Sequence, residues 1–261
     1  MGTPVSPRYP DWSVLHLPHD APGIPADVKD QFLLDDEELA REVLLMTDHR
    51  TADLFGSQRA SGRVARASVS RLVVDVERFD DDAQEPMAGA GMGAVYTSTS
   101  SGGPLRRPLD PWEREALLER WYRPHHRRLE QLVGDALRQH GRAVVVDAHS
   151  FPSRPLPYER AASPDRPDIC VGTDPFHTPT VLRDAFASAF VSVGFRVAVD
   201  TPFAGALVPA RYYRRDPRVQ SVMVEVNRRL YLDEATGLPA ADFAAVAATV
   251  QACCTAALDR L

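Results

Sequence analysis

The sequence predicts one α/β domain, and three observations support that fold class. Short apolar runs rich in β-branched residues alternate with longer segments in which apolar residues recur at helical spacing. The longest predicted helix runs directly into a strand, a succession typical of α/β folds. The chain has 261 residues, 44% of them hydrophobic, and can bury a sizeable core. No internal repeat or disordered linker divides it, so we expect a single domain over residues 1–261.

Apolar, β-branched runs predict five strands. They span residues 13–17, 71–76, 143–146, 195–199 and 219–226, and a short mixed segment covers 166–173. The run 143–146 is entirely apolar and is predicted to be buried on both faces. Four polar side chains follow it, namely Asp147, His149, Ser150 and Arg154. Open α/β sheets hold their ligands outside the carboxyl ends of the strands, so we expect chemistry where this strand ends.

Helical spacing predicts helices over residues 35–46, 110–141, 178–193 and 239–261, with a further helix starting within 25–32. The helix over 110–141 has Asp110 as N-cap and proline next to it, both favourable at a helix start. Pro124 is expected to kink this helix, and Gly141 to end it.

Residues 80–107 form a predicted loop insertion near the site. Their glycines at 89, 91 and 93 follow no strand closely and open no helix. A mobile lid or substrate loop therefore fits this segment better than a phosphate-binding loop does.

Composition excludes several classes of protein. The net charge of −6 and the pI near 5.8 disfavour a nucleic-acid partner, which would require a basic face. No apolar stretch approaches the ~20 residues that span a bilayer, and the N-terminus lacks the pattern of a signal peptide. Three cysteines, Cys170, Cys253 and Cys254, make no disulfide framework. We expect a cytoplasmic protein with a small-molecule substrate and no membrane or nucleic-acid partner; the sequence leaves its oligomeric state open.

Polar residues after the predicted strands suggest a metal centre. A catalytic zinc takes three protein ligands, typically histidines and carboxylates, and keeps one position open. His19 and His149 each follow a strand, and Asp48 lies in a polar turn between them in the chain. Glu225 lies on an apolar strand, where an acid needs a functional or structural reason. It is the candidate that would move a proton between water and a leaving amine.

Each of these residues also has a structural interpretation. His19 fits a turn histidine, Asp48 a helix-flanking acid, and Glu225 an ion-pair partner of an arginine such as Arg78. Asp200, which follows the strand over 195–199, belongs to the same set of strand-end acids. The spacing is too loose for a self-standing zinc motif.

Serine hydrolysis is the main alternative chemistry. Ser150 follows His149 directly, but no Gly-x-Ser-x-Gly elbow is present, and a triad base is not normally the neighbour of its own nucleophile. The other histidines are interpreted as packing, loop or surface residues: His16, His125, His126, His140 and His177.

The chain resembles the N-formylglutamate amidohydrolase family from about residue 14 to about residue 234. Eight motifs match in the order of the family: Leu17-Pro-His-Asp with Ile24-Pro25, Met46-Thr-Asp48 through Leu54-Phe55, Arg71-Leu-Val-Val-Asp-Val-Glu-Arg-Phe79, Gly91-Met-Gly-Ala-Val-Tyr96, Asp147-Ala-His-Ser150, Pro167-Asp-Ile-Cys-Val-Gly172, Pro202-Phe-Ala-Gly205, and Glu225-Val-Asn through Tyr231-Leu-Asp-Glu234. Each motif is unspecific alone, but eight in order identify the resemblance.

The resemblance implies a metal-dependent hydrolase, with zinc as the metal, and a carboxypeptidase-like three-layer α/β/α fold around a mixed, largely parallel sheet. His19, Asp48 and His149 correspond to the metal ligands, and Glu225 to the catalytic acid and base. The implied reaction converts N-formyl-L-glutamate to formate and L-glutamate. Because that substrate is a dicarboxylate, the residues in matched motifs that could bind it are Arg71, Arg78, Arg154 and Asn227. Asp168 also matches, with a structural role at least as well supported.

Two positions depart from the family pattern. Ala52 stands where the family often has a second acid after Asp48, and Asp53 comes one place late. Ala204 replaces the usual lysine, a cation lost from the expected pocket, for which one of the arginines at 211, 214 and 215 could substitute. Two alternatives therefore stay open: a related zinc amidase or carboxypeptidase-like hydrolase with another substrate, and a non-catalytic member that binds a carboxylate.

Overall fold

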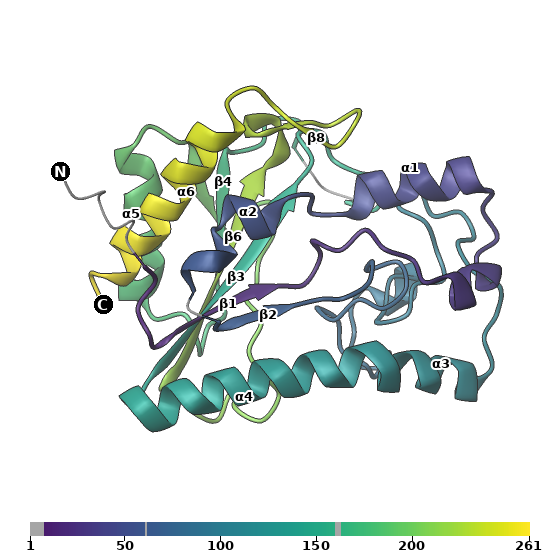
Figure 1. Cartoon of the computed structure of the whole chain (residues 1–261), viewed down its shortest axis with the longest axis horizontal. Helices are drawn as coiled ribbons and strands as arrows, with labels where there is room; N and C mark the ends of the chain where they lie inside the picture. The colour runs from purple at the N-terminus through teal and green to yellow at the C-terminus, as the bar shows by residue number, and fades with distance from the viewer. Residues whose placement is uncertain (1–7, 61, 160–162) are drawn as a thin grey trace.

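A computed structural model describes residues 8–60, 62–159 and 163–261. Its centre is a six-stranded sheet in the order β2-β1-β3-β6-β4-β5 (Figure 1). The strands are β1 (Ser13–Leu17), β2 (Val64–Arg66), β3 (Ala143–Phe151), β4 (Ile169–Gly172), β5 (Val197–Val199) and β6 (Val219–Asn227). The first four in sheet order run parallel, and β4 pairs antiparallel with β6. The expectation of a mixed, largely parallel sheet is confirmed.

The main helices are α1 (Asp36–Met46), α2 (Thr51–Leu54), α3 (Pro111–Leu117), α4 (Arg123–His140), α5 (Thr180–Ser192) and α6 (Phe243–Leu258). Short 3-10 helices cover Ala26–Gln31, Ser57–Arg59, Ala88–Ala90 and Arg228–Leu230, and β7 (Leu232–Asp233) pairs with β8 (Leu238–Pro239). No helix within these described ranges is long and apolar enough to cross a membrane.

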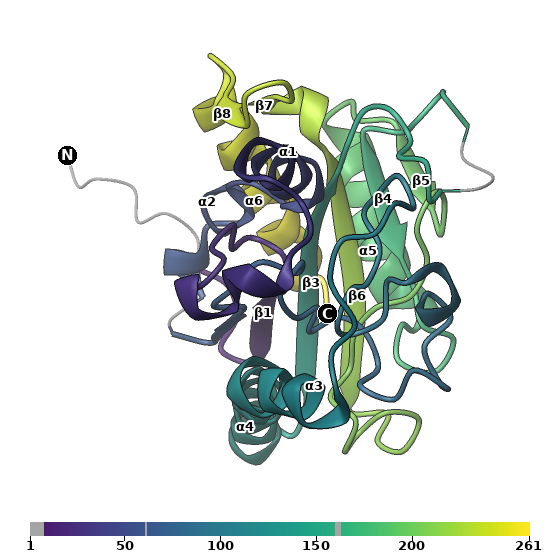
Figure 2. The same cartoon turned by 90° about the vertical axis from the view of Figure 1, so that its right-hand side faces the viewer.

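Alternation along the strands divides the core between the two faces of the sheet. Val144, Val146 and Ala148 of β3 belong to the apolar cluster that packs under α5 and α6. Ala143 and Val145 point to the opposite face and pack against α4. Figure 1 shows α5 and α6 on one side of the sheet and α4 on the other, and in Figure 2 α5 and α6 lie behind the strands, with α4 at the bottom of the view. These are the three layers of an α/β/α fold.

Helix α4 covers only the amino-terminal half of its face of the sheet. Farther along β3 on that face come Asp147 and His149, because side chains two residues apart share a face. Opposite this uncovered half lies a second apolar core, built from α1, α3 and the irregular segment around residues 67–105. Asp147 and His149 therefore lie on the face of the sheet, between two apolar cores. The expectation that β3 ends at Val146 was wrong, since it continues to Phe151 before Pro152 interrupts it.

Two further expectations differ from the structure. Residues 71–76 are buried but form turns, because they pack in the second core and the Asp75 amide bonds to the Ala94 carbonyl, 2.8 Å away. The long helix begins at Pro111 after the N-cap Asp110, as expected, and Asp110 and Glu113 form a capping box. A π-helical segment at Leu118–Tyr122 joins α3 to α4. That segment precedes Pro124, whose missing N–H a regular helix could not accommodate without losing a hydrogen bond.

Candidate metal centre and active-site cavity

His19, Asp48 and His149 come together, although three separate elements carry them. His19 follows β1, Asp48 follows α1, and His149 lies within β3. The Asp48 amide donates to the His19 carbonyl at 3.0 Å, which ties the first two segments together. One nitrogen or oxygen from each of the three buried side chains lies within 4.8 Å of the others. Two imidazoles and a carboxylate are a donor set that suits zinc.

Each histidine of this cluster is held through its Nε2 atom. His19 Nε2 lies 2.8 Å from Asp75 Oδ1, and His149 Nε2 lies 3.0 Å from Asp147 Oδ1. Both Nδ1 atoms are thereby directed toward Asp48, whose Oδ2 is 3.7 Å from the first and 3.2 Å from the second. Metal-binding histidines commonly donate their other ring nitrogen to a carboxylate in this way.

An unpartnered nitrogen of His19 is a further sign that this donor set fits a divalent metal. His19 Nδ1 is buried and has no hydrogen-bond partner among the described residues. A buried nitrogen left without a partner costs free energy, and a metal ion would satisfy it. Together with the two Nε2 contacts, this orphaned atom supports metal binding by His19, Asp48 and His149.

Arg228 neutralises the acid of the cluster, a role that the sequence motifs did not indicate. It donates to Asp48 Oδ1 at 2.9 Å and to the Leu45 carbonyl at 2.6 Å. Burial alone would raise the pKa of Asp48, but the hydrogen bond from His149 and the nearby side chains of His19 and Arg228 hold it well below the usual range. Asp48 is therefore an anion. The available signal was the position of Arg228 beside the matched residues Glu225 and Asn227.

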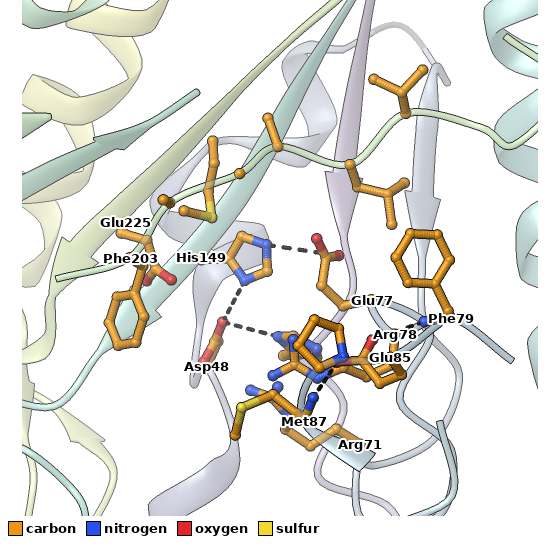
Figure 3. Close-up of a pocket in the computed structure, with 18 of the residues that line it drawn as sticks. Asp48, Arg71, Glu77, Arg78, Phe79, Glu85, Met87, His149, Phe203 and Glu225 are labelled. Carbon is orange, nitrogen blue, oxygen red and sulfur yellow. Dashed lines mark hydrogen bonds and ion pairs between the residues drawn. The ribbon is translucent and has the colours of Figure 1, made fainter. Parts of the chain in front are cut away.

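Glu225 of β6 lies beside His149 of β3, since the two residues are partners in the strand register. Cys170 of β4 is the register partner of Glu225 on the other side. Glu225 Oε2 is buried and has no hydrogen-bond partner in the described part of the chain. Burial raises the pKa of Glu225 to about 7. Figure 3 shows its carboxyl group near His149 and Asp48. A carboxyl group with this pKa can both take and give a proton near neutral pH.

A second cluster lies behind the first. His16 Nδ1 lies 2.8 Å from Asp147 Oδ1, the same oxygen that contacts His149, and 3.7 Å from Glu77 Oε2. His16 Nε2 continues the chain to His125 Nε2 at 2.8 Å. The groups of His16, Glu77 and Asp147 also meet the distance requirement for a metal site. The contacts of Asp147 Oδ1 with His16 and His149 instead indicate a polar network that orients His149, and Glu77 Oε2 is buried beside it without a hydrogen bond to a described residue.

The cluster opens into a cavity of about 890 Å³. Its lining includes His19, Asp48, His149 and Glu225, together with Arg71 and Arg78. Part of its wall comes from residues 80 and 84–87, which belong to the segment 80–107. Burial would lower the pKa of Arg71, but Asp75, 2.7 Å from its guanidinium, holds it well above its usual range. Arg78 Nε is buried without a hydrogen bond to a described residue, 3.8 Å from Asp75 Oδ2.

The sequence matches the N-formylglutamate amidohydrolase family model over residues 13–232. The chain belongs to the N-formylglutamate amidohydrolase family. It is 29% identical over 195 residues to an N-formylglutamate deformylase of Pseudomonas putida, covering 72% of this chain and 71% of that protein. It is 27% identical over 174 residues to one of Pseudomonas aeruginosa, covering 64% of each chain.

Two solved structures share the fold of this family member. An N-formylglutamate amidohydrolase from Ralstonia eutropha JMP134 superposes with a TM-score of 0.82 at 22% identity, covering 98% of both chains. A gene product of Agrobacterium tumefaciens has a TM-score of 0.63 at 19% identity, covering 93% of this chain and 88% of that one. These likenesses establish the α/β fold.

Some of the predicted binding residues lie away from the cavity of this family member. The Arg154 side chain is exposed and does not line it. The side-chain amide of Asn227 donates from Nδ2 to the Pro167 carbonyl at 3.0 Å. Its Oδ1 accepts from the Arg229 backbone and caps the 3-10 helix that follows. Asp168 holds the Arg196 amide at 2.8 Å and pairs with Arg229, which is a structural arrangement. Arg71 and Arg78 thus line the cavity, whereas Arg154 and Asn227 lie outside its lining.

Ala52, Asp53 and Asp200, which the sequence analysis singled out, do not contribute to the cluster. Ala52 packs in the core under α6, and Asp53 is exposed and pairs with Arg50, so neither adds a donor to the cluster. Asp200 accepts from the Thr173 amide and hydroxyl, both at 2.7 Å. Although Asp200 follows a strand, as His19 does, it lies outside the cavity lining, because β5 runs opposite to β6.

Proposed function

We propose that this protein is a zinc-dependent amidohydrolase that cleaves the C–N bond of a small N-acyl amino acid, with N-formyl-L-glutamate as the reference substrate. One observation carries the proposal: the His19–Asp48–His149 cluster and the unpartnered carboxyl group of Glu225 face the same cavity. Hydrolysis adds water across the amide and gives a carboxylate and a free amine, here formate and L-glutamate.

His19, Asp48 and His149 would hold the metal. When bound, a divalent ion there would supply Lewis acidity, polarising the acyl oxygen and lowering the pKa of a water molecule to about 7. Asp75 and Asp147 keep the two imidazoles in the required orientation through the Nε2 contacts of 2.8 Å and 3.0 Å.

Glu225 moves the proton. Its carboxylate accepts a proton from the attacking water and then donates it to the nitrogen of the leaving amine, which would otherwise depart as a poor leaving group. The pKa of about 7 suits both steps, because the group is neither a very weak base nor a very weak acid at neutral pH.

Arg78 binds the substrate carboxylate. Its buried Nε lacks a hydrogen bond to the described residues, whereas Arg71 already donates to Asp75 at 2.7 Å and to Tyr96 at 3.1 Å. A guanidinium meets a carboxylate through parallel hydrogen bonds, which fixes the orientation of the amide relative to Glu225. Arg71 supports this site by keeping Asp75 charged and in place.

The deciding experiment combines metal analysis with an assay of formate release. About one zinc ion per chain and chelator-sensitive release of formate from N-formyl-L-glutamate are expected. A zinc-loaded protein that cleaves only other N-acyl amino acids would favour the related amidase. A protein that binds carboxylates but neither holds metal nor turns over would contradict the proposal and favour the non-catalytic member.

A further inference from the structure

The cavity is much larger than a formyl group and a glutamate require. Its volume of about 890 Å³ lies near the upper end of the ~300–1,000 Å³ of sites for drug-sized ligands. We propose that the cavity contains an apolar subsite for the acyl group, an inference that rests on the proposed amide hydrolysis. The favoured substrates are then N-acyl amino acids whose acyl chain is an extended hydrocarbon rather than formyl.

An apolar wall lies directly beside Glu225. Phe203 is placed there by a hydrogen bond of 3.2 Å from the Cys170 thiol to its carbonyl, and Cys170 is the register partner of Glu225. The ring of Phe203 meets that of Phe151 at 5.8 Å between centroids, and both rings line the cavity. Met223, on the same strand face as Glu225, extends this wall. Figure 3 shows Phe203 next to the Glu225 carboxyl group.

The residues behind this apolar wall are closely packed, and this packing holds Met223 and the segment at 203–209 in place. A Cβ atom at Gly172 would lie 2.3 Å from Met223 Cε and 2.5 Å from the Gly205 carbonyl oxygen. Glycine at 172 therefore lets β4, Met223 and the segment at 203–209 approach one another. That segment contains no charged side chain. Arg166 stacks behind Phe151 at 4.8 Å, but its guanidinium is bound to Glu159 at 2.8 Å and does not line the cavity.

Two of the arginines that line the cavity, Arg71 and Arg78, lie on the opposite side of the cluster. In Figure 3, Arg71 and Arg78 are grouped across His149 and Asp48 from Phe203 and Glu225. In an N-acyl amino acid, the carboxylate is on the nitrogen side of the scissile bond and the acyl chain is on its carbonyl side. A carboxylate bound by Arg78, with the amide at the cluster, directs the acyl chain toward Phe203, Phe151 and Met223.

Burial of the hydrocarbon chain explains why extended acyl groups would be preferred to formyl. Each further CH₂ that is buried strengthens binding, so a hexanoyl chain that fills an apolar subsite should bind severalfold more tightly than a formyl group even with partial burial. A formyl group would leave this wall in contact with water. Phe151, Phe203 and Met223 carry no charge, so this part of the cavity wall offers contacts to hydrocarbon rather than an ion pair to a second carboxylate.

The test is a chain-length series on one amino acid: N-formyl-, N-acetyl-, N-butanoyl- and N-hexanoyl-L-glutamate with zinc-loaded protein. We expect kcat/KM to rise at least tenfold from formyl to hexanoyl. Calorimetry with the zinc-loaded Glu225→Gln variant measures binding of the same compounds and should show the same order. Cleavage that is fastest for formyl and falls with chain length would overturn the subsite but uphold the proposed hydrolysis. Tighter binding of hexanoyl without turnover of any compound would uphold the subsite and overturn the hydrolysis.

A matched pair of variants locates the subsite. Phe203→Ala should lower the hexanoyl-to-formyl ratio of kcat/KM at least fivefold. Phe176→Ala removes the same side chain from a 44% exposed position outside the cavity lining and should leave the ratio unchanged. An equal loss for both substrates in Phe203→Ala would contradict the assignment.

A second series with formyl on L-leucine and L-phenylalanine tests the amino-acid side chain as occupant. A gain confined to that series would also overturn the acyl assignment.

Discussion

At the scale of single residues, the site depends on atoms whose partners are missing or shared. His19 Nδ1 and Glu225 Oε2 are buried without hydrogen bonds to the described residues, whereas Asp147 Oδ1 contacts both His149 and His16. Orphaned atoms of this kind mark positions that a ligand or a proton completes. The shared oxygen fixes an imidazole in one orientation. His19 and Glu225, which have such orphaned atoms, are therefore the candidates for contact with metal or substrate, whereas Asp147 positions His149.

Glu225→Gln removes the proton acceptor but keeps the shape of the side chain. We expect zinc to remain bound at about one ion per chain and kcat to fall by ~10²-fold or more, the usual contribution of general acid–base catalysis. Metal analysis and a rate assay on the same sample measure both. Retention of full activity would exclude Glu225 as acid and base.

The pH dependence follows from the raised pKa of Glu225. In the metal-free protein the carboxyl group should titrate near 7, protonated below and ionised above. A bound cation favours the ionised form and should lower this pKa. Activity should therefore be lost on the acid side as the base becomes protonated. Infrared difference spectra of wild type against Glu225→Gln, with and without zinc, measure the carboxyl pKa directly; a band that titrates identically in both proteins would belong to another group.

Asp147→Asn tests orientation without removing a ligand. The amide still fills the space but is a weaker acceptor for His149 Nε2, now at 3.0 Å from the carboxylate. We expect zinc affinity to fall ~10–100-fold, the usual effect of changing a partner of a metal-binding histidine. Competition with a chelator measures the affinity. Asp200→Asn, outside the cavity lining, is the matched control and should bind zinc normally.

At the scale of elements, alternation and capping were predictable, and the irregular parts were not. The strand over 13–17, the capping box on Asp110 and the helix end at Gly141 follow from local sequence. The run 71–76 was misassigned because a buried β-branched segment has the same composition in a strand and in a packed turn. Ala143–Phe151 was predicted too short because its second half is polar, and polarity there reflects the site rather than solvent.

Gly141 provides an element-scale prediction. It ends α4 with φ of 73°, a left-handed conformation that costs an L-residue with a side chain about 1 kcal/mol. Gly141→Ala should lower the free energy of unfolding by ~1 kcal/mol, measured by urea denaturation. Gly89→Ala is the control: nothing lies within 4 Å of its Cβ position, so no comparable loss is expected. Equal losses in both variants would contradict the conformational explanation.

At the scale of the whole molecule, the site lies where two apolar cores face each other across the sheet. One wall is the sheet, and the other belongs to the core formed by α1, α3 and the segment around 67–105. The candidate ligands were predictable from strand ends and family motifs. Arg228 and the exclusion of Arg154 were not, since both depend on how the loops fold back over the sheet. Long-range packing of this kind leaves little local signal.

Metal removal should destabilise the whole fold, because the three candidate ligands join β1, β3 and the turn after α1. Ligand binding at 1,000 times the dissociation constant stabilises a protein by ~4 kcal/mol. We therefore expect chelation to lower Tm by several degrees in calorimetry. The shift should persist in Glu225→Gln and vanish in His149→Ala. A Tm independent of zinc in the wild type would argue against this metal centre.

The wide separation of the ligands in the chain has a consequence for biosynthesis. His19 and Asp48 leave the ribosome early, but His149 follows only after the whole of α3 and α4 has been made. Its neighbour Glu225 belongs to β6 and emerges later still. Contacts between such distant segments form late because closing a long loop costs entropy. The nascent chain thus lacks the full set of candidate ligands until His149 has been made, so we expect it to capture a metal ion only after that point.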